Sequence, residues 1–219
     1  MSTAPDHTAA HADTGMSGRS EELLNGILRY IRLHGVEQFS LATVADFLGT
    51  SSRMLIYHLG SRDEILIKAT SLRRMTTSAF LRERPVTGLA ESARRMWEHY
   101  LNNLWEMQLF FFVSTRAFAQ PVAYARFARD SRDVWMEYLT DGCAKDGINY
   151  ESAVPVAGLC LAGLRGLFLD LLLTGDRERA ESSFIVLVEQ LESARVSRFK
   201  NPEYPVNENG SISTAARRS

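Results

Sequence analysis

The side chains best suited to binding chemistry lie between Ser40 and Arg62. An arginine in the first turn of a helix, as Arg53 would be, can donate two parallel hydrogen bonds to O6 and N7 of guanine, and Met54 can contact a thymine methyl group. Hydroxyls and further cations nearby can hydrogen-bond phosphate oxygens. The types and spacing favour a surface that contacts duplex DNA through Ser40, Thr43, Ser51, Ser52, Arg53 and Met54. For Arg53 the alternative is a solvated surface role.

Two short helices that cross at a tight turn must position these side chains. Gly49 tolerates the left-handed backbone that such a turn needs and has no side chain to obstruct it. Ser40 is placed to cap a helix that opens at Leu41, and Ser51 to cap or open the second helix. Apolar or small residues that can hold the pair together are Val44, Ala45, Leu48 and Leu55.

The sequence also indicates where the second helix ends and the third begins. Gly60 offers a left-handed stop for the second helix, and Ser61 and Glu64 have the spacing of a capping box that starts a third. Any helical domain can contain one such turn, but this joint placement favours a helix-turn-helix.

The segment from Leu23 to Leu66 resembles the N-terminal DNA-binding domain of TetR-type bacterial transcriptional regulators. Gly35 matches the end of that family's first helix, Gly49-Thr50-Ser51 its G-V-S turn, and IYHLGSR from Ile56 its Y-x-H-F-x-S-K stretch. The resemblance implies DNA contacts, chiefly to phosphate, by Tyr57, His58 and Arg62; for His58 the alternative is a packed ring at a helix end. The departures are Thr50 for an apolar residue, Leu59 for Phe, Arg62 for Lys, and Ile56 for a tyrosine that hydrogen-bonds phosphate.

This resemblance implies an all-α fold in which an N-terminal three-helix helix-turn-helix domain precedes a larger helical ligand-binding and dimerisation domain. It implies a ligand-responsive regulator, by family default a repressor, that binds a palindromic double-stranded DNA operator as a dimer. A small hydrophobic or aromatic effector would release it. An alternative is a helical ligand-binding or interaction protein whose DNA-binding helix has degenerated, which Ile56 and the low net charge favour.

Length and composition agree with a small two-domain regulator. The 219 residues are 45% hydrophobic, with a formal net charge of −1, so any attraction to DNA must come from a local basic face. We expect disordered tails at 1–17 and 201–219, a DNA-binding domain at 18–66 and a helical sensing and dimerisation domain at 67–200. No signal peptide is apparent, and Cys143 and Cys160 fit a reducing cytoplasm.

The region after residue 66 shows helical periodicity and no strand pattern. Apolar spacing predicts helices over Leu89–Met107, Val122–Lys145, Ala153–Leu173 and Arg177–Phe199. The run from Ala153 is long enough to span a membrane, but Arg165 and Asp170 interrupt it, which favours a buried helix and no membrane partner.

The last two of these helices are the expected homodimer interface. A stripe of small residues, Gly158, Ala162 and Gly166, lets another helix approach closely, and the final helix presents Phe184, Leu187, Val188 and Leu191 on one face. The pair would form half of a four-helix bundle, as TetR-type proteins do. The alternative is an intramolecular core helix.

Many aromatic residues and a few polar ones in this region are candidates for an effector pocket, although such a stripe is more often plain core. They are Trp97, Tyr100, Asn103, Trp105, Gln108, Phe111, Arg116, Tyr124 and Trp135. No nucleophile with a base, metal cluster or phosphate-binding glycine loop stands at a recognisable spacing. We therefore expect no enzyme activity, no metal and no cofactor.

Overall fold

The structure is a computed structural model that describes residues 18–196. Every regular element in that range is helical, which confirms the expected all-α class. The predicted tails, and the predicted extension of the final helix to Phe199, lie outside the described residues. The helices are α1 (Gly18–His34), a 3-10 turn η1 (Val36–Gln38), α2 (Leu41–Phe47), α3 (Ser52–Leu59), α4 (Arg62–Arg82), α5 (Leu89–Asn102), α6 (Leu104–Ala119), α7 (Pro121–Lys145), α8 (Tyr150–Thr174) and α9 (Arg177–Val196).

The predicted boundaries around the helix-turn-helix are confirmed. Ser40 Oγ accepts the backbone N–H of Thr43, and Ser51 Oγ accepts that of Met54. Gly49 has φ 62° in the turn between α2 and α3, a left-handed conformation that a glycine adopts without strain. Local hydrogen bonds therefore set the starts of α2 and α3.

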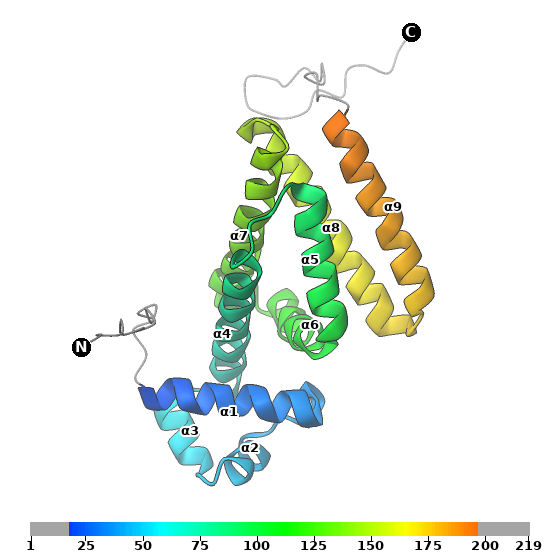
Figure 1. Ribbon diagram of the computed structural model, residues 1–219. Coiled ribbons are helices and arrows are strands. Elements are labelled where there is room, and N and C mark those ends of the chain that lie inside the picture. Colours follow the sequence, from blue (N-terminus) through cyan, green and yellow to red (C-terminus); the bar gives the residue numbers. More distant parts are fainter. Residues whose placement is uncertain (1–17, 197–219) are drawn as a thin grey trace, which may run out of the picture.

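The N-terminal helices share a core that does not stop at residue 66. Leu24 and Ile27 of α1 pack with Leu55 of α3, and the same cluster continues into Leu109 of α6 and Phe127 of α7. The expected domain boundary at 66/67 also falls inside α4, which runs unbroken from the helix-turn-helix into the larger helical region (Figure 1). The N-terminal helices are thus packed directly on α6 and joined to the larger region through α4.

The larger region is built from α5, α7, α8 and α9, with α6 crossing near the junction with α1 (Figure 1). The indole of Trp97 stacks between the rings of Phe168 and Phe184, with ring centroids 4.6 and 4.5 Å away. The prediction of one helix over Leu89–Met107 is wrong, because Asn103 leaves helical geometry (φ −134°, ψ 50°) and separates α5 from α6.

Helix α8 is buried on one face only. By length and composition alone it is the one helix among residues 18–196 that could cross a membrane, and about a third of its most apolar window is buried. Its inner face packs on α7 and α9, whereas Leu159 and Leu173 are 69% and 75% exposed. The expectation of a buried helix therefore holds for one side of α8 within this chain.

The apolar face of helix α9 that was expected to form the dimer packs inside the subunit. Phe184, Val188 and Leu191 are buried against the chain's own helices, and the apolar residues left exposed are Ile185 and Val186. This corrects the expected use of that face: its large side chains complete the subunit's own core, and a dimer contact would use their neighbours.

Candidate nucleic-acid interface and ligand cavity

The start of α3 presents an exposed surface on a firmly packed helix. Leu55 and Leu59 are buried against α1 and α4, whereas Arg53 and Met54 face outward. Tyr57 is 79% exposed. One face of α3 therefore anchors the helix and the other is available to a partner.

The predicted serine and threonine contacts also build the helices that carry them. Ser40 and Thr43 exchange hydrogen bonds in a capping box at the start of α2, and Ser51 caps α3 while Ser52 begins it. Their hydroxyls lie near the surface. The cap at Ser51 thus fixes the first turn of α3, from which Arg53 projects.

At the end of α3, Tyr57 and His58 lie beside Ile56, the residue that replaces the family's tyrosine. The rings of Tyr57 and His58 meet edge to face with centroids 5.0 Å apart. His58 is only partly exposed, while Ile56 is 48% exposed and offers no hydrogen bond. Ile56 therefore cannot make the phosphate contact of the family's tyrosine, and Tyr57 and His58 are the polar side chains beside it.

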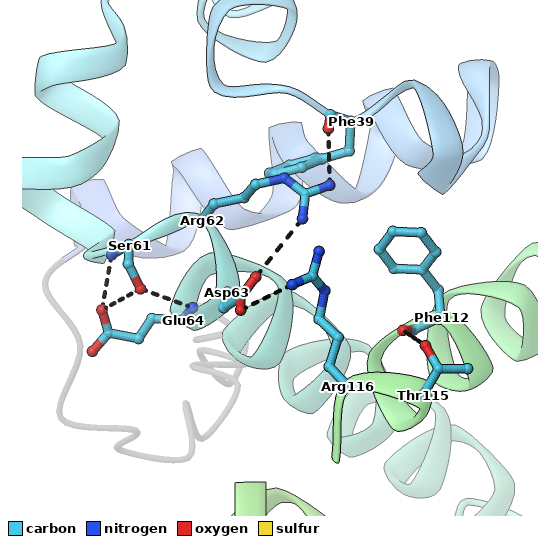
Figure 2. Close-up of polar contacts among 8 residues, drawn as sticks. All are labelled: Phe39, Ser61, Arg62, Asp63, Glu64, Phe112, Thr115 and Arg116. Atoms are coloured by element: carbon cyan, nitrogen blue, oxygen red, sulfur yellow. Dashed lines mark hydrogen bonds and ion pairs between the residues drawn. The ribbon is translucent and has the colours of Figure 1, made fainter. Parts of the chain in front are cut away.

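Arg62 lies within an intramolecular cluster in this structure (Figure 2). Its guanidinium donates to the backbone oxygen of Phe39 at 3.2 Å and lies 3.7 Å from the carboxylate of Asp63. It also lies over the rings of Phe39 and Phe112. The predicted phosphate contact of Arg62 requires the side chain to leave these partners.

Arg116 completes that cluster from α6 by donating to Asp63 at 3.2 Å (Figure 2). The carboxylate of Asp63 thus joins Arg62, at the start of α4, to Arg116, near the end of α6. We call Arg62, Asp63 and Arg116 the junction cluster.

The charge of the helix-turn-helix region is close to balanced. Residues 18–66 contain five arginines against six carboxylates, and the arginines after that point, Arg73 and Arg74, turn toward the interior of the larger region. The net charge of residues 18–66 therefore provides no overall electrostatic attraction to DNA. Binding would rest on the few cations at the α3 surface and on their duplication in a dimer.

A cavity lies between α4, α5, α6, α7 and α8. Its accessible volume is about 50 Å³, and the wider non-atom space, which includes open solvent, is about 580 Å³. Its aromatic walls are Tyr100, Phe110, Trp135 and Phe168, and its charged residues are Arg73, Arg74, Glu106 and Arg165. The cavity is narrow and apolar with several ionised groups.

Glu106 is the centre of the acidic half of this cavity. Its carboxylate accepts hydrogen bonds from Arg73 at 2.6 Å and from Thr77 at 2.9 Å, and lies 3.1 Å from the ring nitrogen of His99. Burial opposes its ionisation, but the hydrogen bonds with His99 and Arg73 outweigh burial and hold the pKa of Glu106 below its usual value. Glu106 and Arg73 therefore form an ion pair inside the protein.

Two of the nine candidate pocket residues, Tyr100 and Trp135, line the cavity. Burial raises the pKa of Tyr100 above its usual range, so its hydroxyl stays protonated. Trp97 is buried in the stack with Phe168 and Phe184, and Arg116 belongs to the junction cluster. The other five lie elsewhere on α5 to α7: Asn103, Trp105, Gln108, Phe111 and Tyr124.

Sequence reasoning missed the ionisable lining. Arg165 was noticed only as an interruption of the apolar run in α8, although an arginine within such a run has to find a polar environment inside the fold. Nothing in the sequence marked Arg73 or Arg74 as residues of the interior. Among residues 18–196 no group of three or more His, Cys, Asp or Glu side chains could hold a metal ion.

Comparisons with known proteins identify the fold. No protein-family model matches the chain, and no curated protein matches it in sequence. Among solved structures it is similar to a TetR transcriptional regulator from Legionella pneumophila, with a TM-score of 0.65 and 18% identity over 81% of this chain and 100% of that one. It is also similar to the multidrug binding protein EbrR in complex with proflavin, with a TM-score of 0.59 and 19% identity over 78% of this chain and 98% of that one.

Because these identities are low, the comparisons show the fold alone. The chain has the TetR-type fold, with an N-terminal helix-turn-helix and a larger helical region.

Proposed function

We propose that this protein is a ligand-responsive transcriptional regulator that binds a palindromic DNA operator as a homodimer. The observation that carries the proposal is the exposed first turn of α3, held in place by the caps at Ser40 and Ser51 and by the buried Leu55. In a two-fold dimer two such helices would enter successive major grooves about 34 Å apart. Repression, with release by a small molecule in the cavity, is the form of regulation we infer.

The proposed dimer contact is the exposed apolar surface of α8 and α9. Within residues 18–196, a β-carbon added to Gly158 or Gly166 would meet no atom within 4 Å other than those of the neighbouring α8 backbone, and Leu159 and Leu173 lie exposed on the same helix. This surface gives a partner helix close access to the α8 backbone, and burying it would remove apolar area from water. A second copy of the chain would present the same surface, as a two-fold dimer requires.

Helix α6 offers a route between the cavity and the DNA-binding surface. Glu106 and Phe110 reach the cavity from one part of α6, and Arg116 pairs with Asp63 from another. We propose that a ligand shifts α6, that the junction cluster passes the shift to α4, and that the spacing of the two α3 helices changes. The ligand must favour one arrangement for this to release DNA.

The test of DNA reading is the substitution Arg53→Ala. Loss of a bidentate contact to guanine removes about 1–3 kcal/mol of discrimination at one base pair, so the variant should lose preference for that guanine in each half-site. The measurement is fluorescence anisotropy with duplexes selected from a random pool, titrated at several salt concentrations. Arg94→Ala is the control, because Arg94 pairs with Glu192 of α9 and should leave the preference unchanged.

The same titration distinguishes the regulator from the second candidate function, a ligand-binding protein with a degenerate DNA-binding helix. The near balance of charge in residues 18–66 and the exposed Ile56 favour that candidate. Absence of salt-dependent binding to every selected duplex would eliminate the regulator and leave the ligand-binding protein. Neither function assigns catalysis to the chain, and a regulator of chromosomal genes would act in the cytoplasm.

A further prediction concerns Arg62. Asp63→Asn removes the carboxylate that Arg62 and Arg116 share, so Arg62 can turn to a phosphate and DNA affinity should rise about tenfold. The salt slope should steepen by about one per subunit. Asp46→Asn is the matched control, because it removes one exposed carboxylate from α2 without freeing an arginine. Equal gains in the two variants would show that Asp63 does not restrain Arg62.

A further inference from the structure

Two buried arginines from different helices converge on one residue of the cavity wall. Arg74 of α4 donates to the hydroxyl of Ser131 at 2.8 Å, and Arg165 of α8 donates to the backbone oxygen of Ser131, also at 2.8 Å. Arg74 is 8% exposed and Arg165 is partly buried. Both guanidinium groups therefore lie at the same side of the cavity, where they meet α7.

Neither of these two cations has a carboxylate in ion-pair distance within the described part of the chain. The cavity's own carboxylate, Glu106, is already paired with Arg73. Asp130 lies near enough to stabilise charged Arg74 but forms its ion pair with Arg126. Nε of Arg74 is buried and has no hydrogen-bond partner in residues 18–196. The cavity thus holds two positive charges in excess.

This arrangement is costly without a counter-ion. Burial lowers the pKa of both Arg74 and Arg165, and for Arg165 the positive charge of Arg74 lowers it further. Arginine nonetheless keeps its proton in proteins, so the two charges persist and repel each other. An anion placed between them would relieve the repulsion and accept the free N–H groups.

The other side chains of the cavity wall indicate the non-ionic part of the ligand. The side chains of Tyr100, Phe110 and Trp135 are aromatic, and Met96 and Met107 add polarisable sulfur. The guanidinium of Arg165 lies 5.0 Å from the centroid of the Phe110 ring, so the cationic and aromatic parts of the wall adjoin. The accessible space of about 50 Å³ is smaller than the roughly 150 Å³ of a cavity that takes a benzene ring, so the ring part must be small and flat and the walls must move outward to admit it.

We infer that the cavity selects a small aromatic carboxylate, with its oxyanion between Arg74 and Arg165 and its ring against the aromatic wall. The inference rests on the proposed function in one respect, that this cavity is the sensory site. It narrows the hydrophobic effector expected from the sequence to an amphipathic anion. It also distinguishes this cavity from a site for aromatic cations, because Arg74 and Arg165 would repel a positive ligand.

The experiment compares ligands that differ only in charge. Benzoate, benzyl alcohol and benzylammonium, and the corresponding 2-naphthyl series, are titrated onto the full-length protein by isothermal calorimetry. Intrinsic tryptophan fluorescence, to which Trp135 of the cavity wall contributes, is a second signal for the benzyl series. The variants are Arg74→Gln and Arg165→Gln, with Arg94→Gln as an exposed control. Arg165→Lys keeps the charge and shows the effect of side-chain shape if Arg165→Gln fails to fold, which circular dichroism reports.

The expected result is that a carboxylate binds at least about tenfold more tightly than its alcohol, and the ammonium more weakly than either. Each glutamine variant should lose most of that preference while its affinity for the alcohol stays within about twofold. Equal affinity for carboxylate and alcohol, tighter binding of the ammonium, no binding of either carboxylate, or a preference that survives in both glutamine variants would each overturn the inference.

The outcome is separable from the proposed function because these titrations contain no DNA. A parallel anisotropy measurement adds the carboxylate to the protein bound to its selected duplex. Carboxylate selectivity without release of DNA would leave the anion site standing and contradict ligand-responsive regulation. Release of DNA by the neutral alcohol alone would support regulation and contradict the anion site.

Discussion

Replacing Trp97 with alanine should lower the free energy of unfolding by about 3–5 kcal/mol. Its indole is 4% exposed and lies between the rings of Phe168 on α8 and Phe184 on α9, so the substitution removes apolar contact on both sides and leaves a cavity between three helices. Aromatic pairs contribute beyond their buried area, which adds to the loss. In a chain of this length the midpoint of thermal unfolding should fall by roughly 10 °C or more.

Urea unfolding followed by circular dichroism measures this change. Phe118→Ala is the control, because Phe118 is 85% exposed and its loss should alter the free energy of unfolding by no more than about 0.5 kcal/mol. The sequence placed Trp97 among the effector contacts. A change in unfolding free energy below about 1 kcal/mol, together with a loss of ligand affinity, would restore that role and contradict the core assignment.

The second large effect is expected at the proposed dimer surface. Substituting both Leu159 and Leu173 by glutamate places two charges on an exposed apolar face of α8. Burying two carboxylates against their symmetry-related copies is strongly unfavourable, so the dimer should dissociate. Affinity for a palindromic duplex should then fall by about a hundredfold or more, because the two half-sites are no longer bound by one linked molecule.

Sedimentation equilibrium reports the mass, and anisotropy reports the affinity for the full palindrome and for an isolated half-site. The control is Val122→Glu, which adds the same charge at a residue that is 90% exposed at the start of α7. The half-site affinity of the double variant should be unchanged, since α3 is untouched. A double variant that still sediments as a dimer would show that α8 does not form the contact.

The boundaries of α2, α3 and α4 could be read from the sequence because short-range interactions set them. Ser61 and Glu64 bond each other's backbone within one helical turn, and Gly60 ends α3 with φ 90°. These features depend on residues three or four positions apart. Asn103 shows where such reading fails: the apolar period continues across it, yet its backbone leaves the helix.

The face of α9 shows a second kind of failure. Phe184, Leu187, Val188 and Leu191 were recognised as one apolar face, but periodicity cannot say whether such a face meets the chain's own core or a second subunit. Only the tertiary structure shows which apolar residues of α8 and α9 stay exposed.

The cavity was the least predictable feature. Arg74 and Arg165 are 91 positions apart and meet at Ser131 on a third helix. No local sequence pattern around any of these three residues indicates that they are in contact. Arg62 is similar: its spacing after α3 matches a phosphate contact, while its position in the structure depends on Phe112 and Asp63.

The sequence by itself therefore determined the all-α class, the helix-turn-helix and its caps, because local backbone conformation and side-chain period specify them. Only the tertiary structure decided which aromatic residues are core, which arginines are buried together, and which apolar faces remain exposed. The physical reason is that burial and charge pairing depend on contacts between distant helices, and the energy of an arginine or a tryptophan is set by those neighbours rather than by its place in the chain.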